Sequence, residues 1–187
     1  MGNFPIFAQG NCPHDDINQC KWQQSDRAAV WDRESPEARP GYFSISLANG
    51  VHAKMTTTNR SALYRFTFNE PSSQPLSPVV LLDLMDLPRS RRSGSADVDR
   101  STGRLTGSGT FSPSFGIGSY KSYVCVDFKG AELRDTGIWE RNQPDISRRT
   151  LNLGSDASSF LSAGAFARFY APKDNNILVR VGVSFIS

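Results

Sequence analysis

The residues best suited to acid–base chemistry stand together in one short polar loop, CPHDDINQC, at residues 12–20. His14, Asp15 and Asp16 follow one another there. A glycosidase needs two carboxyl groups that face one cleft, about 5 to 10 Å apart, one of them acting as the acid. Acids that are neighbours in sequence more often cap or solvate a turn. A small hydrolase built on these three residues is therefore an alternative, not the main interpretation.

Two of the three cysteines bound this loop. Cys12 and Cys20 have a spacing that suits a local disulfide, whereas Cys125 stands alone in a strand-like run. A zinc site needs about four ligands, and only His14 and His52 are available beside the cysteines. The pattern favours the disulfide, and we expect no metal ion to be bound by this chain.

Three tryptophans could contribute to a sugar-binding surface. Trp22, Trp31 and Trp139 each carry an indole ring that can stack on the face of a sugar. The same ring fills a core or an interface just as well, so each position has a structural interpretation beside the functional one.

The glycine-rich stretch GSGTFSPSFGIGSY (107–120) resembles a phosphate loop only in composition. A phosphate loop needs a helix after the glycines and a lysine at a fixed spacing, and the residues that follow alternate like a strand. We predict that these glycines occupy turn or bulge positions between two strands. The sequence therefore offers no nucleotide site here.

Other charged residues have mainly structural interpretations. The basic run from Arg89 to Arg104 also contains acids, serines and glycines, which is typical of a solvated loop; an anion or glycan contact is the alternative. Asp83 and Asp86 flank the end of an apolar run and are predicted to be strand-end or turn residues.

One covalent modification has a specific signal. Asn59-Arg60-Ser61 is an N-x-S sequon, and no second sequon occurs in the sequence. In a secreted protein Asn59 would be a possible acceptor for an N-linked glycan.

The composition limits the possible partners. The 187 residues are sufficient for one domain with a core, and a formal net charge of +3 does not indicate nucleic acid or a membrane surface. No stretch approaches the ~20 apolar residues of a membrane span. The start, MGNFPIFAQG, lacks the features of a signal peptide.

The elements that must position these residues are strands. Alternation of apolar and polar residues recurs at 43–47, 51–55, 62–68, 124–128 and 177–185, and residues 79–84 are apolar apart from Asp83. Asn49-Gly50 supplies the residues of a tight hairpin turn. No window of eleven residues has a helical stripe. The pattern predicts an all-β antiparallel sandwich of about nine or ten strands.

Six segments in order carry a resemblance to a known family. The chain resembles, from Gly2 to Ser187, the N-terminal domain of glycoside hydrolase family 92, most closely the fungal members described as α-1,2-mannosidases. The segments are GNFPIFAQ, CPHDDINQC, ARPGYFSISLANG, MTTTNRSALYRFTF, TGSGTFSPSFGIGSY and NILVRVGVSFIS.

The resemblance implies a β-sandwich of the supersandwich type, like that of galactose mutarotase, followed in the family by an (α/α) barrel. It implies secreted, calcium-dependent, inverting enzymes that remove mannose from N-glycans or mannan, with the active site between the two domains. The catalytic acid and base, and most calcium ligands, belong to the barrel, so no catalytic residue is carried over to this chain. The family's segment upstream of GNFPIF has no counterpart here.

The expected product is therefore a single partial domain, residues 1–187, incomplete at both ends and inactive alone. It would pack on the absent barrel and form one wall of the mannose pocket, with Trp22 and Trp31 as substrate-binding candidates. The fungal pattern agrees with the Cys12–Cys20 pair and with the sequon at Asn59. A stand-alone mannose-binding module is the alternative from another functional class.

Overall fold

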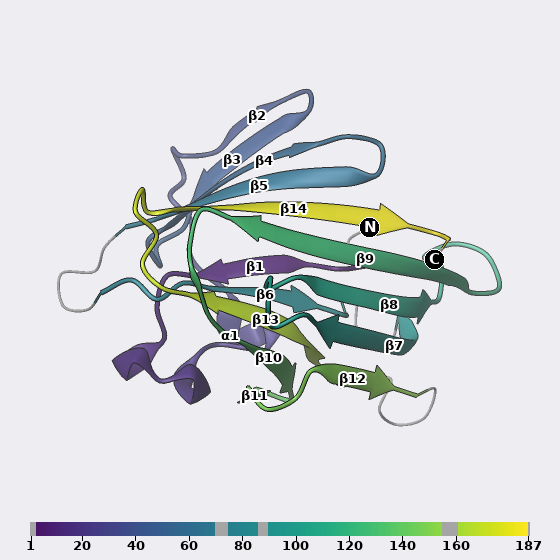
Figure 1. The fold of residues 1–187 in the computed structure, drawn as a ribbon. Helices are drawn as coiled ribbons and strands as arrows, with labels where there is room; N and C mark the ends of the chain where they lie inside the picture. Colours follow the sequence, from purple (N-terminus) through teal and green to yellow (C-terminus); the bar gives the residue numbers. More distant parts are fainter. Residues whose placement is uncertain (1–2, 70–74, 86–89, 155–160, 187) are drawn as a thin grey trace.

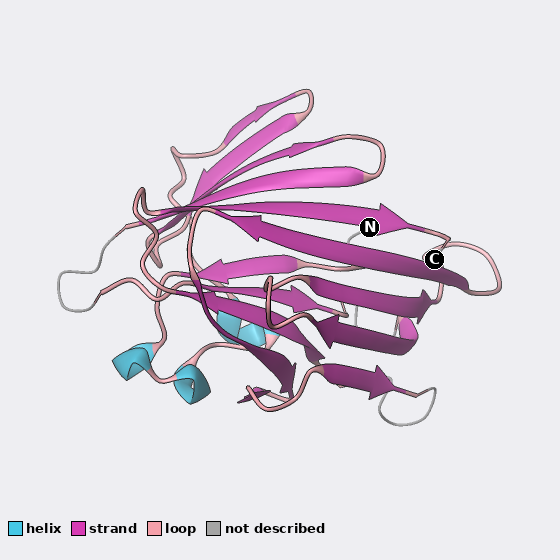
Figure 2. Ribbon diagram, viewed as in Figure 1, coloured by secondary structure: helices cyan, strands magenta, loops and turns pink. Residues whose placement is uncertain are grey.

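The computed structural model describes residues 3–69, 75–85, 90–154 and 161–186. Nearly all regular structure in this part of the chain is β-strand (Figure 2), which confirms the predicted all-β class. The strands form two antiparallel sheets that face each other as a sandwich (Figure 1). The three helical segments are short: η1 (Pro13–Asp15), η2 (Ile17–Gln19) and α1 (Gln24–Arg27). None of the helices in the described residues is long and apolar enough to cross a membrane.

The smaller sheet has five strands and carries the buried middle of the molecule. Its central strands are almost fully covered on both faces, as the largely apolar run at 79–84 predicts. In spatial order the strands are β1 (Ile6–Gln9), β6 (Val79–Asp83), β13 (Ala163–Phe169), β10 (Leu133–Glu140) and β11 (Gln143–Asp145).

The larger sheet has nine strands and extends beyond the smaller one. Along β14, Ile177, Val179 and Val181 are buried and Arg180 is exposed, so the alternation read from the sequence is confirmed as far as Val181. Val183 and Phe185, predicted on the same side, are exposed. In spatial order the strands are β12 (Thr150–Leu153), β7 (Arg91–Val98), β8 (Leu105–Phe111), β9 (Tyr120–Lys129), β14 (Asn176–Ser184), β5 (Ser61–Phe68), β4 (Val51–Thr57), β3 (Tyr42–Ser46) and β2 (Glu37–Arg39).

Two turn predictions are confirmed. Gly50 has a φ of +82° between β3 and β4, a left-handed conformation that glycine adopts without strain. In the glycine-rich stretch, Gly116 and Gly118 have positive φ in the connection from β8 to β9, and the residues that follow form a strand. Gly116 and Gly118 are therefore turn glycines, as predicted, whereas Gly107 and Gly109 lie within β8 and not in a turn or bulge.

The interpretation of residues 89–104 as a solvated loop is wrong for its central part. Residues 91–98 form β7, which pairs with both β8 and β12, and Arg91 is buried with its Nη2 atom donating to the Leu161 carbonyl at 2.5 Å. The sequence pattern does not predict this strand, because small and charged residues, Gly94 and Ala96 among them, stand where other strands have large apolar residues. The strand count is also higher than nine or ten: fourteen strands lie in the described residues.

The core has two parts. The larger lies between the sheets and includes Phe68, Leu82, Phe111 and Val126. The smaller lies on the outer face of the five-stranded sheet, where the loop formed by residues 10–27 covers it. This loop makes a third layer, and it holds the residues with which the sequence analysis began.

Candidate functional site

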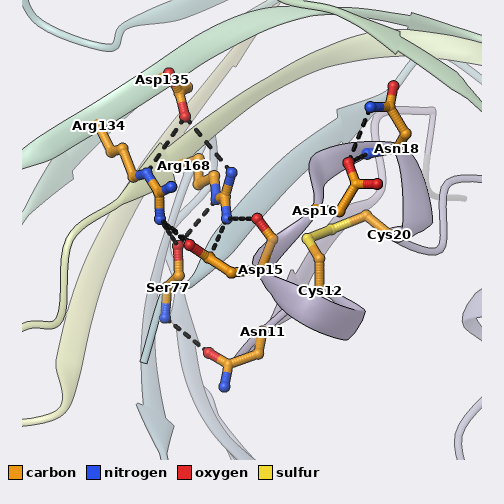
Figure 3. A network of polar contacts seen from close by, with 10 residues as sticks. All are labelled: Asn11, Cys12, Asp15, Asp16, Asn18, Cys20, Ser77, Arg134, Asp135 and Arg168. Carbon is orange, nitrogen blue, oxygen red and sulfur yellow. Dashed lines mark hydrogen bonds and ion pairs between the residues drawn. A yellow bond between two sulfur atoms is a disulfide. The ribbon is translucent and has the colours of Figure 1, made fainter. Parts of the chain in front are cut away.

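The Cys12–Cys20 disulfide predicted from the sequence is present (Figure 3). It closes the loop that contains η1 and η2, and both cysteines are buried against Trp22 and the outer face of the five-stranded sheet. The disulfide therefore fixes the shape of the loop, and the buried cysteines pack this third layer against the sandwich.

Asp15 connects the same loop to two strands. Its carboxylate accepts from Arg134 Nη1 of β10 at 2.8 Å and forms an ion pair with Arg168 of β13. Ser77 Oγ accepts from the two guanidinium groups, at 3.0 Å from Arg134 Nη1 and 2.9 Å from Arg168 Nε. Arg168 is itself buried, and Asp135 lies 3.6 Å from it on the other side (Figure 3). Asp15 is thus one member of a network that fixes the loop.

The pKa values of Asp15 and Asp16 are shifted in the wrong direction for a general acid. Burial raises the pKa of Asp15, but the hydrogen bond from Arg134 and the charge of Arg168 outweigh it, so the pKa lies below its usual value. The backbone N–H of Asn18 donates to Asp16 and lowers the pKa of that carboxyl as well. A glycosidase acid needs a raised pKa. Asp15 and Asp16 therefore hold structure, while the neighbouring His14 is exposed.

Trp22 is a core residue. It has no exposed surface; its ring lies 4.8 Å from that of Phe166 and 6.1 Å from that of Trp139, centroid to centroid. A ring enclosed in this way cannot stack on a sugar, so the structure corrects the expectation for Trp22. Trp139 belongs to the same cluster.

Trp31 lies at the surface, with 46% of the residue exposed. It forms a β-bridge with Leu47 beside β3, and the Ala48 N–H donates to the Val30 carbonyl at 2.7 Å. Residues 28–31, which we call the strap, therefore run from α1 on the outer layer to the edge of the nine-stranded sheet. Trp31 stays a candidate for sugar contact.

The strap crosses a groove between β1 and the nine-stranded sheet. One cavity of about 530 Å³ and another of about 410 Å³ share Phe7, Arg27, Ala28 and Ala29 as lining residues. The larger one also has polar walls, formed by Gln9, Asn11, Lys21, Asn49 and Asn69. We call these two cavities the strap groove. Side-chain amides beside aliphatic surface suit a hydroxyl-rich ligand, and Lys21 and Arg27 add positive charge to the lining.

A buried ion pair lies beside the strap groove. The Arg27 guanidinium pairs with Asp83 at the end of β6, and it also lies over the rings of Phe7 and Trp139, at 5.5 and 5.7 Å from their centroids. Burial raises the pKa of the Asp83 carboxyl, with the charge of Arg27 acting against that rise. Asp83 ends its strand as predicted, but no sequence signal connected it with Arg27. Asp86 lies outside the described residues.

The β1 side of the sandwich is open. In the described residues β1 pairs with β6 alone. The Asp83 N–H donates to the Pro5 carbonyl, so the odd-numbered residues of β1 face β6 and the backbone groups of Ile6 and Ala8 point to the free edge. Beside that edge lies a cavity of about 150 Å³, lined on the opposite side by Ile45, Leu47, Val51, Ala53, Met55, Tyr64 and Phe66.

The remaining candidates lie apart from the groove. Asn59 is exposed between β4 and β5. Cys125 is a free, partly buried cysteine in β9, and burial raises the pKa of its thiol. Among the described residues, no three His, Cys, Asp or Glu side chains are grouped so that they could hold a metal ion.

This chain is similar in sequence or in structure to several glycosidases. An uncharacterised secreted glycosidase of Arthroderma benhamiae is 45% identical over 192 residues, which span all of this chain and 25% of the relative. An inverting family 92 mannosidase from Bacteroides thetaiotaomicron aligns with a TM-score of 0.74 and 16% identity over 98% of this chain and 22% of its own.

A family 92 α-mannosidase of the same bacterium aligns with a TM-score of 0.71 and 19% identity, covering 100% of this chain and 24% of its own. Its complex with mannoimidazole aligns over the same shares at 0.66 and 18%. At these identities the solved structures establish the fold. The chain spans about a quarter of the length of the relatives it matches. Residues 1–184 match the model of the glycosyl hydrolase family 92 N-terminal domain, and the chain therefore belongs to this family.

Proposed function

We propose that this chain is the non-catalytic N-terminal β-sandwich portion of a secreted exo-α-1,2-mannosidase that acts on N-glycans or mannan. It packs on the rest of the family polypeptide, an (α/α) barrel, and contributes one wall of the mannose pocket. The family membership supports the enzyme class, and the secreted relative supports the location. Calcium would serve the whole enzyme and would be held mainly by the barrel.

The observation that carries the proposal is the open β1 side. A sandwich that is complete by itself covers the inner faces of both sheets and protects its edge strands. Here the backbone groups of Ile6 and Ala8 that point away from β6 have no hydrogen-bond partner among the described residues, while the nine-stranded sheet continues past β1 with Ile45, Met55 and Tyr64 only half-buried. Further polypeptide that pairs with β1 would cover these side chains and satisfy the edge. Packing against more chain is therefore the expected state of this surface.

The acids support a scaffolding role. A retaining or inverting glycosidase needs one carboxyl whose pKa is raised and whose surroundings admit a substrate. Asp83 has the raised pKa but is buried against Arg27, and Asp15 and Asp16 have lowered values and structural partners. The catalytic acid and base are accordingly assigned to the part of the family enzyme beyond this chain.

The strap supplies the proposed sugar contacts. Trp31 and Val30 are 46% and 75% exposed, and Val30 also lines the larger cavity of the strap groove. Trp31 itself lines neither cavity; its exposed indole, next in sequence to Val30, is of the kind that stacks on one face of a sugar, and the amides of the groove are suited to hydroxyl groups. The proposed mannose wall therefore centres on the strap and not on Trp22.

The isolated chain provides the first test. We expect no release of mannose from α-1,2-mannobiose or yeast mannan, with or without calcium, and no saturable heat of binding to mannose, mannobiose or mannan. Hydrolysis that is lost on Asp15→Asn would support the small-hydrolase alternative. Saturable binding that is lost on Trp31→Ala but kept on Trp139→Phe would instead support a stand-alone mannose-binding module.

A further inference from the structure

The sequon Asn59-Arg60-Ser61 has no part in the proposed scaffold role, and the structure places it at the tip of a hairpin. Strand β4 ends at Thr57 and β5 begins at Ser61, so the sequon occupies the reverse turn and the first residue of the next strand. All three of its residues are exposed. None of the three residues lines the strap groove.

The backbone of this turn is held, while the acceptor side chain is not. The Thr58 N–H donates to the Ser61 carbonyl at 2.8 Å, and the Val183 N–H of β14 donates to the Arg60 carbonyl at 2.9 Å. The hydroxyls of Thr58 and Ser61 lie 2.7 Å apart. The Asn59 amide makes no hydrogen bond to another described residue. Its Nδ2 atom can therefore carry a substituent without breaking a contact of the fold.

From the motif and this geometry together, we propose that Asn59 is the acceptor of an N-linked oligosaccharide when the chain passes through the secretory route. The co-reactant is an oligosaccharide joined through a diphosphate to a lipid. Asn59 Nδ2 attacks the anomeric carbon of the first sugar and forms a C–N bond. The bond from that carbon to the diphosphate oxygen breaks, the lipid diphosphate leaves with the electron pair, and the amide loses one proton to a base. No oxidation or reduction is involved.

A glycan on Asn59 restricts how the rest of the protein can pack. The oligosaccharide projects from the hairpin tip into solvent, so the end of the β4–β5 hairpin has to stay uncovered in the whole polypeptide. The free edge of β1 belongs to the other sheet, so packing there remains possible. The glycan inference does not depend on the mannosidase proposal, because it rests on the sequon and its exposure alone.

The test expresses the full 187-residue chain behind a heterologous signal peptide in yeast and measures the intact mass before and after treatment with peptide N-glycosidase. We expect a fraction of the secreted chain to lose mass on treatment, with aspartate left in place of Asn59. Asn59→Gln should abolish the shift, and Ser61→Ala should do the same by removing the hydroxyl of the sequon. Ser61→Thr keeps the sequon and should retain the shift.

The controls separate occupancy from folding. Asn59→Gln and Ser61→Thr should be secreted and should give far-ultraviolet circular dichroism spectra typical of β-sheet, like the parent. A secreted, folded parent chain whose mass does not change on treatment overturns the assignment. So does a mass shift that persists in Asn59→Gln, because the glycan would then lie elsewhere.

Discussion

The guanidinium of Arg27 and the carboxylate of Asp83 form an ion pair in which both side chains are buried, at 6% and 2% exposure. The pair joins α1 in the outer layer to the end of β6 in the five-stranded sheet. Arg91 is a second cation close enough to act on Asp83, and burial lowers the pKa of that guanidinium. The buried Arg27–Asp83 ion pair therefore fixes the residue at which the strap begins.

Removal of one partner of this pair should be strongly destabilising. Arg27→Met leaves the Asp83 carboxylate buried without its main partner, and we expect the free energy of unfolding to fall by about 3–5 kcal/mol. The double variant Arg27→Met/Asp83→Leu should recover part of that loss. Urea unfolding of the two single variants and the double variant measures the coupling, and strictly additive losses would contradict it.

The Arg27→Met defect should depend on pH. Because the pKa of Asp83 is raised in the folded state, ionising it disfavours folding as pH rises from the unfolded value of about 3.9 through the raised folded value. Without Arg27 this penalty grows. The stability gap between parent and variant should be smallest near pH 4 and widen toward neutral pH, and a gap that does not change with pH would argue against an ionised Asp83.

Asp15→Asn should show the opposite pH dependence. The pKa of Asp15 is lowered in the folded state, so its stabilising effect is present above about pH 4 and is lost as pH falls through the folded value. Asp15 is half-exposed, and we expect only about 1–2 kcal/mol at neutral pH from the lost charged hydrogen bonds. Unfolding followed from pH 2 to 7 tests this. Asp26→Asn is the matched control, because the exposed Asp26 carboxylate accepts a hydrogen bond only from Ser25 among the described residues.

Reduction of the Cys12–Cys20 disulfide should loosen the outer layer. The bond spans eight positions in sequence, and its loss frees the loop in the unfolded chain, which corresponds to about 2–4 kcal/mol. We expect a lower unfolding midpoint in the presence of a reductant. The double variant Cys12→Ala/Cys20→Ala should be destabilised to a similar extent and should not respond to the reductant; a response there would implicate Cys125.

Two strand glycines should differ sharply in their tolerance of a methyl group. A Cβ atom on Gly164 of β13 would lie 1.9 Å from the Leu82 carbonyl oxygen, whereas one on Gly182 of β14 would meet nothing within 4 Å. Gly164→Ala should lower stability by about 3 kcal/mol and Gly182→Ala by no more than about 0.5 kcal/mol. Equal thermal shifts for the two variants would show that β13 does not pack on β6 as described.

The sheets could be predicted where one face of each strand is buried, because alternation then records which side chains point inward. For this reason the hairpin at Gly50 and the long strand β14 could be predicted from the sequence. Strand β7 could not, since it places a buried arginine and small residues where large apolar ones mark other strands. Strand β7 forms because it pairs with β8 on one side and β12 on the other, and this pairing leaves no alternation in the sequence.

The candidate site was predicted less well, because it is made by one loop folding over the outer face of a sheet. Spacing alone indicated the disulfide, since residues 12 and 20 are local. Whether Trp22 or Trp31 is exposed depends on contacts with Phe166 and Leu47, which are distant in sequence. The ion pair of Arg27 with Asp83 spans 56 positions, and neither residue type signals the other.

The central claim is that this chain serves a mannosidase only when joined to the rest of a family 92 polypeptide. The most direct measurement replaces the 192 matching residues of the Arthroderma benhamiae glycosidase with this chain and assays mannose release from α-1,2-mannobiose, with the unchanged relative alongside. We expect the chimaera to release mannose, the chain alone to release none, and Trp31→Ala in the chimaera to raise KM more than it lowers kcat. A chimaera that folds and is secreted but stays inactive beside an active parent would contradict the account.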